Sequence, residues 1–240
     1  MRKSHDKDKA MTNGPPRDDV ASLTEKAYQA ISGAIARLEL KPGEALTQDR
    51  LAKWLSISRT PVREALRRLE QDRIIHTAPG RGLVVTELTI KDAEDLLEML
   101  ALLDTHAAYL AAQRRSATQA DQLVEIAQML LVAAERNDLA AWEEIDHPYH
   151  ETLLDASGNL FLRRSIEDIR RRLQRLTYHL AIQPEHLIAG THEHVALAQA
   201  ISERKAEQAA EIMRQHLETM HSMAMRLIRT HIVPVRGERF

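Results

Sequence analysis

Hydrophobic residues recur every three or four positions along most of the chain, which is the spacing of an amphipathic helix. The first such stretch has its apolar residues at Ala27, Ile31, Ala34, Ile35 and Leu38. Upstream of them, Ser22 and Glu25 have the spacing of a capping box. We therefore expect the first helix to run from Ser22 to about Leu38.

Two shorter helices are predicted next. Thr47 is the expected cap of the first, over residues 48–55. Ser58 or Thr60 caps the second, which reaches about Gln71. Proline is tolerated in a first helical turn, and Pro61 lies there. The tight turn between these helices suits a helix-turn-helix.

Residues 74–85 depart from the helical spacing. Ile74–Thr77 and Leu83–Val85 are short runs of residues that favour strands, and Pro79–Gly82 between them has the composition of a turn. The pattern predicts a small hairpin, the only sheet that we expect. Three helices followed by a hairpin describe a winged helix-turn-helix.

From Thr89 onward the spacing is helical throughout. The predicted helices are 90–114, 116–136, 138–156, 160–183, 190–202 and 204–231. The expected protein is therefore mainly α, with an N-terminal winged helix-turn-helix and a C-terminal all-α helical bundle. The predicted divisions are a disordered tail (1–19), a DNA-binding domain (20–88), a helical effector-binding and dimerisation domain (89–232) and a C-terminal tail (233–240).

Composition and charge narrow the class of protein. The 240 residues include no cysteine, which excludes disulfides and thiolate metal sites and fits a reducing cytoplasm. No apolar run approaches the length of a membrane span, so we expect a soluble, cytoplasmic protein with no membrane partner. Residues 20–88 carry eleven Lys and Arg against eight Asp and Glu, whereas 89–232 carry fifteen against twenty-two. Only the basic N-terminal part is suited to a polyanion.

The predicted helix ending near Gln71 divides its side chains between two faces. Its apolar stripe consists of Val62, Ala65, Leu66 and Leu69, and a separate stripe consists of Arg59, Arg63 and Arg67 beside the hydroxyls of Ser58 and Thr60. A recognition helix needs this division, because its apolar face fixes it while arginines reach bases or phosphates. Arg81, at the hairpin tip, can reach a phosphate or the minor groove. The alternative is that these arginines form an ordinary solvent-exposed helix face with no binding role. The tight turn before the helix and the glycine-bounded hairpin after it favour DNA binding.

The acidic half contains a candidate metal site. Asp146 and His150 are four residues apart on one predicted helix, so both point the same way, about 6 Å apart. His194 and His216 lie on two consecutive predicted helices, at heights that differ by about one turn if these are antiparallel. One carboxylate and three imidazoles suit a divalent transition metal such as Zn, Mn or Ni. With 12 histidines in the chain, spacing alone leaves chance pairing open.

Three stretches of the N-terminal part form a specific signature: LKPGE at 40–44, Leu51 with Ala52, and SRTPVREALRRLE at 58–70. They resemble the DNA-binding domain of bacterial repressors of the GntR family. The resemblance implies base, phosphate and groove contacts from the recognition helix and the wing. The candidate DNA-binding residues are Ser58, Arg59, Thr60, Arg63, Arg67, His76, Gly80, Arg81 and Gly82.

Two positions depart from that family pattern. Arg73 stands where the family usually has glycine. Asp49 stands where some members have an arginine that touches DNA. We therefore expect no DNA contact from Asp49.

Residues 90–230 carry further marks: Asp146, Tyr149, His150 and Leu153, the segment 156–159, then Glu193, His194, Leu197 and Ser202, and finally Ala209, Met213, His216 and Leu217. They resemble the FCD effector domain of the FadR branch of the GntR family. That resemblance implies that Asp146, His150, His194 and His216 hold a metal at the floor of a ligand cavity. Many members have an arginine in the first helix of this domain, where this chain has Leu100. If that arginine neutralises an effector carboxylate, the candidates to replace it are Arg171, Arg172 and Arg175.

We expect a ligand-responsive transcriptional repressor that dimerises through the bundle and binds a palindromic double-stranded DNA operator. A small organic acid bound at the metal-containing cavity is the expected effector. One alternative is a metal sensor without an organic effector. A metal-dependent enzyme is disfavoured, because the chain lacks HExxH, GxSxG and phosphate-loop motifs and Glu193 is expected to point away from the ligands.

Overall fold

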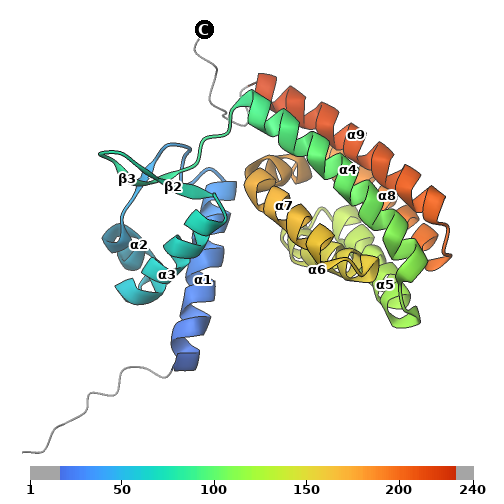
Figure 1. Cartoon of the computed structure of the whole chain (residues 1–240), viewed down its shortest axis with the longest axis horizontal. Helices are drawn as coiled ribbons and strands as arrows, with labels where there is room; N and C mark the ends of the chain where they lie inside the picture. Colours follow the sequence, from blue (N-terminus) through green and yellow to red (C-terminus); the bar gives the residue numbers. More distant parts are fainter. Residues whose placement is uncertain (1–16, 231–240) are drawn as a thin grey trace, which may run out of the picture.

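The helices fall into two groups with separate hydrophobic cores, joined at residues 86–89 (Figure 1). The computed structural model describes the backbone of residues 17–230 and the side chains of 21–183 and 187–230. The N-terminal elements are α1 (Arg17–Ala36), β1 (Ala45–Leu46), α2 (Gln48–Leu55), α3 (Arg59–Gln71), β2 (Ile75–Ala78) and β3 (Gly82–Val85). The bundle consists of α4 (Ile90–Arg114), α5 (Ala117–Glu135), α6 (Leu139–Ser157), α7 (Leu160–Ala181), α8 (Pro184–Ser202) and α9 (Ala206–Arg229).

The N-terminal domain is a winged helix-turn-helix. Helices α1 and α3 pack together around Ile31 and Leu66, which are almost completely buried. The predicted hairpin is present as β2 and β3, but a third strand extends the sheet in the order β1-β3-β2. The prediction of a hairpin alone is therefore wrong. Strand β1 has only two residues, too few for an alternating pattern to be visible in the sequence.

The first helix begins at Arg17 rather than at Ser22. The predicted capping box is therefore wrong, because Ser22 lies inside α1. Residues 1–16 and the predicted tail 233–240 lie outside the described residues.

In the bundle, α4 and α9 lie side by side, and α5 packs against both α6 and α8 (Figure 1). Most predicted bounds agree with the structure within two residues. The exception is α8, which begins at Pro184 rather than near residue 190. Proline at this first position costs no hydrogen bond, because the first N–H groups of a helix have no partner within it. No helix in the described part of the chain is long and apolar enough to span a membrane.

The end of α3 explains one departure from the family pattern. Arg73 has a φ of 58°, and its amide donates to the carbonyl of Glu70. This left-handed conformation follows the helix end, where glycine is common because it carries no Cβ. Arg73 adopts the backbone conformation that the usual glycine would adopt at lower cost.

Candidate functional site

Helix α3 presents two faces, as the residue spacing predicts. Val62, Ala65, Leu66 and Leu69 are at most 1% exposed, within the N-terminal core. The side chains of Arg59, Arg63 and Arg67 are more than half exposed. We call this exposed set the arginine face. Helix α3 is therefore anchored along one side and free to meet a large partner along the other.

Each arginine of this face has an acidic neighbour. Arg59 Nε lies 2.7 Å from Asp49 Oδ1 on α2, and Arg67 Nε lies 3.2 Å from Glu64 Oε2. Arg63 Nε lies 3.6 Å from the other oxygen of Glu64. Exposed ion pairs contribute only about 0–1 kcal/mol. The arginines can therefore exchange these partners for phosphates at little cost.

Ser58 and the wing complete the surface. Ser58 is the N-terminal cap of α3 in an extended conformation, but its hydroxyl makes no capping hydrogen bond. Gly80 and Gly82 both have positive φ, and the Arg81 guanidinium between them donates to the carbonyl of Gly43 (2.6 Å). His76 is exposed on β2. Arg81 is thus folded back onto the segment between α1 and β1 rather than extended from the wing tip.

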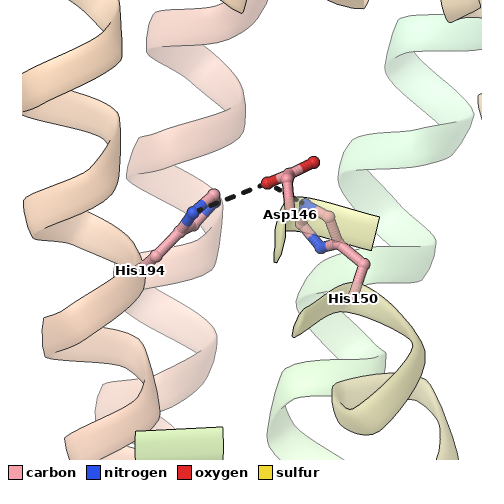
Figure 2. Close-up of side chains that lie close together, drawn as sticks. All are labelled: Asp146, His150 and His194. Atoms are coloured by element: carbon pink, nitrogen blue, oxygen red, sulfur yellow. Dashed lines mark ion pairs between the residues drawn. The ribbon is translucent and has the colours of Figure 1, made fainter. Parts of the chain in front are cut away.

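A cluster of metal-ligating side chains lies inside the bundle. Asp146 and His150 extend from α6 and His194 from α8, and one ligand atom from each lies within 4.8 Å of the others (Figure 2). His150 Nε2 is 3.5 Å from Asp146 Oδ1, and His194 Nδ1 is 4.0 Å from it. We call these three residues the Asp–His cluster. These separations suit groups that share an ion better than groups that hydrogen-bond to one another.

The buried atoms of the Asp–His cluster fit a metal. Asp146 Oδ1, His150 Nδ1 and both ring nitrogens of His194 are buried without a hydrogen-bond partner within the described chain. Such orphaned polar atoms are costly unless a ligand satisfies them. Carboxylate and imidazole donors are the ligands expected for a divalent transition metal.

The protonation states of the cluster also suit a metal. Burial lowers the pKa of His150, and it lowers the pKa of His194 further, with repulsion from His216 and His150 adding to the effect. Burial opposes ionisation of Asp146, but the nearby His150, His194 and Arg170 outweigh it and lower the pKa of that carboxyl. Neutral imidazoles and an ionised carboxylate are the forms that bind metals.

The fourth predicted ligand, His216, lies beside the cluster but outside its tightest group. Its ring centroid is 5.0 Å from that of His194, and its Nδ1 is 2.6 Å from Glu193 Oε2. The prediction that Glu193 points away from the site is wrong, because its side chain reaches from α8 to α9. A carboxylate on one ring nitrogen fixes the ring and its tautomer, as is common for metal-binding histidines.

His194 is held in place by Tyr149. The two rings stack with centroids 4.7 Å apart, and the Tyr149 hydroxyl donates to the backbone carbonyl of His194 (2.9 Å). Tyr149 is fully buried on α6, one residue before His150. The contact therefore ties α6 to α8 at the level of the ligands.

A cavity of about 920 Å³ contains the cluster and extends to the N-terminal domain. Its lining includes all four predicted ligands and, from α1, Tyr28 and Ser32. The two domains are joined along this wall, where the Ser32 hydroxyl donates to Gln174 Oε1 of α7 (2.7 Å). Changes in the cavity can therefore act directly on α1.

A second contact ties α3 to α7. Asp72, which caps the end of α3, lies 3.1 Å from Arg171 Nε and accepts a hydrogen bond from the Tyr28 hydroxyl (2.8 Å). We call the contacts of α7 with α1 and α3 the domain seam. The helix that carries the arginine face is thus linked to the wall of the cavity.

Of the three arginines that the sequence suggested for an effector, Arg171 lines the large cavity and the other two do not. Arg171 is engaged with Asp72, and Arg175 is buried beside a separate small hollow. Arg172 lines that same hollow and not the large cavity. Arg170, which the sequence argument did not name, lines the large cavity and acts electrostatically on the Asp–His cluster.

Comparisons with known proteins agree with both domains. Residues 23–85 match the model of the bacterial regulatory proteins of the gntR family, and residues 95–219 match the FCD domain. A helix-turn-helix transcriptional regulator from the TAR-I ttuE–ttuC′ intergenic region of Agrobacterium vitis is 32% identical over 56% of this chain and 80% of its own. The transcriptional repressor RspR of Escherichia coli K12 is 24% identical over 86% of this chain and 90% of its own.

A solved structure supports the fold. E. coli McbR/YncC superposes with a TM-score of 0.73 at 23% identity, covering 85% of this chain and 97% of that one. These families comprise DNA-binding transcriptional regulators rather than enzymes. The chain belongs to the GntR family of bacterial transcriptional regulators and carries the FCD type of C-terminal domain.

Proposed function

We propose that this regulator is a repressor that leaves its operator when a small organic acid binds at a metal held by the Asp–His cluster. The observation that carries the proposal is the cluster itself, whose unpartnered ligand atoms lie in a cavity that reaches the DNA-binding domain. The similarity to a protein named a transcriptional repressor supports repression as the outcome. The arginine face, Ser58, Thr60, His76 and the wing residues Gly80, Arg81 and Gly82 are the proposed DNA contacts.

Asp146, His150 and His194 would hold the ion, with His216 as the fourth ligand. Zn, Mn and Ni all accept this donor set. When bound, the ion supplies a positive centre whose remaining coordination positions an oxygen-rich ligand can complete. Tyr149 and Glu193 orient two of the imidazoles, so the ligands are placed before the ion arrives.

The domain seam supports a route from the cavity to DNA. An effector favours whichever domain arrangement it binds more tightly, so it must interact differently with two arrangements in order to act. Ser32 and Gln174 lie in the cavity wall and bond to each other across the seam. A ligand that alters this contact shifts α1, and with it α3, relative to the bundle.

A homodimer is part of the proposal. One recognition helix covers only a few base pairs, so two copies on a palindromic operator supply the necessary specificity. Met99 and Leu102 on α4 are apolar side chains that are about half exposed or more. They are candidates for the dimer contact of the bundle.

The test combines elemental analysis with gel shifts on an operator selected from random duplexes. We expect one divalent ion per chain and an organic acid that lowers operator affinity only in the metal-loaded protein. Operator affinity that follows free metal without any acid would favour a metal sensor instead. Protein purified without chelator that contains no metal would contradict the proposal.

A further inference from the structure

Arg170, in the wall of the same cavity but not among the metal ligands, belongs to a charged pair. Arg170 of α7 donates from Nη2 to Asp104 Oδ2 of α4 over 2.7 Å. Asp104 is only 1% exposed, whereas Arg170 lines the cavity and retains 26% of its side-chain exposure. The pair therefore has a buried anchor and a cation that a ligand can reach.

This pair is incompletely satisfied. Arg170 Nε and Asp104 Oδ1 are buried and have no hydrogen-bond partner in the part of the chain that the structure describes. Buried charged groups normally complete their hydrogen bonds, because leaving them unmade is costly. The pair thus resembles a site prepared for another polar group.

Arg163 provides a contrast within the same cavity. It also lines the cavity, but its guanidinium is engaged by the carboxylates of Glu151, Asp155 and Glu167. Three acidic partners leave Arg163 little attraction for a further anion. Arg170 has one carboxylate partner, and its Nε donor makes no hydrogen bond within the described chain.

Arg170 is also close to the Asp–His cluster. Its charge helps to lower the pKa of Asp146, His150 and His194. Once an ion is bound, a ligand between the cluster and Arg170 has a positive centre at each end, which an anion suits better than a neutral molecule.

We infer that Arg170, held in place by Asp104, is the second attachment point of the effector, which is an organic acid with a carboxylate for the guanidinium and an oxygen for the ion. A guanidinium binds a carboxylate through two parallel hydrogen bonds, which an amide cannot reproduce. This inference rests on the proposed function. It adds to that function the residue that binds the carboxylate of the effector.

The test uses the metal-loaded, full-length protein and calorimetric titration with lactate and succinate, each compared with its amide. Replacing Arg170 alone would leave Asp104 buried without a partner, so the main variant is the double substitution Asp104→Asn/Arg170→Gln. The matched control is Arg163→Gln, which removes a cavity arginine that is already paired. Metal content and operator affinity are measured on the same samples.

We expect at least one of the two acids to bind the wild type and Arg163→Gln with similar affinity, and to bind the double variant at least about tenfold more weakly. The amides should bind poorly to all three proteins, and metal content should be unchanged. Equal acid affinity in the double variant, equal binding of acid and amide, or no acid binding to the metal-loaded wild type at millimolar concentration would overturn the inference. Loss of metal from the wild type would instead overturn the proposed function.

Discussion

The arginine face and the Asp–His cluster are built in opposite ways. Three exposed residues of one helix form the arginine face, and each has a carboxylate nearby. The cluster is assembled from α6 and α8 and leaves buried ligand atoms unpartnered. Weakly paired surface charges suit a polyanion that binds and leaves, whereas buried, unsatisfied donors suit an ion that stays. The following predictions separate the two regions.

Removing a cluster ligand should have the largest effect, and only on one region. His194→Ala is expected to lower metal affinity by about a hundredfold or more, because it leaves an incomplete donor set. Operator affinity should stay within about twofold of the wild type, because the arginine face lies on the surface of another domain and does not contact His194. Elemental analysis beside a gel shift measures both. Full metal occupancy in both His194→Ala and His216→Ala would exclude this site.

Removing an arginine should produce the reverse result. Arg59→Ala or Arg63→Ala is expected to cost about 1–3 kcal/mol of specific DNA binding if the side chain contacts a base. Metal content should not change. Arg214→Ala, an exposed arginine of α9, is the control for loss of one positive charge. Unchanged operator affinity in both α3 variants would refute the assignment of α3 as the recognition helix.

Glu193 should matter less than the ligands. Glu193→Gln keeps the length of the side chain but weakens the bond that orients His216, and we expect metal affinity to fall about tenfold. Competition with a metal-binding dye gives the value. Glu207→Gln, on an exposed residue of α9, is a suitable control. An unchanged affinity would show that the contact with Glu193 does not help His216 to bind the ion.

Acid should destabilise the metal-free protein. His150 and His194 have a lowered pKa in the folded state, so the unfolded state takes up protons first as the pH falls below about 6.5. Stability is then lost at about 1.4 kcal/mol for each unit by which a pKa is lowered. Asp146 does not contribute in this range, because its lowered pKa matters only below its ordinary value of 3.8.

Urea unfolding at pH 7.5 and 5.5 measures this loss, with His147→Gln as a control on an exposed histidine. The loss should be the same in that control and smaller in His194→Ala. A metal-free wild type that is equally stable at both pH values would contradict the buried, neutral state of the imidazoles.

The smallest effect is expected at the end of α3. Arg73→Gly should raise stability by about 0.5–1 kcal/mol, because a left-handed backbone is strained for a residue with a Cβ. Operator affinity should be unchanged. Thermal unfolding checks the shift, and a lower melting temperature would mean that the Arg73 side chain makes a stabilising contact that outweighs the strain.

The two regions also differ in what the sequence could predict. The faces of α3 follow from local spacing, so Arg59 and Val62 were placed correctly from the sequence alone. The four candidate ligands were named from spacing and family resemblance. The contact between Glu193 and His216 was missed, because it depends on how the side chains of α8 and α9 pack. Arg170 was missed for the same reason, because only the packing of α7 against α4 brings it to Asp104.

The central claim is that a ligand in the cavity moves the DNA-binding domain relative to the bundle, and an electron-spin distance measurement tests it most directly. The chain has no cysteine, so Lys53→Cys on α2 and Glu125→Cys on α5 place two labels uniquely on exposed positions. Labelled chains are diluted with unlabelled ones, so that each distance is measured within one chain. We predict that the organic acid that releases the operator also changes the distance distribution, and that a chelator abolishes the change. An unchanged distribution under conditions that release the operator would contradict the claim.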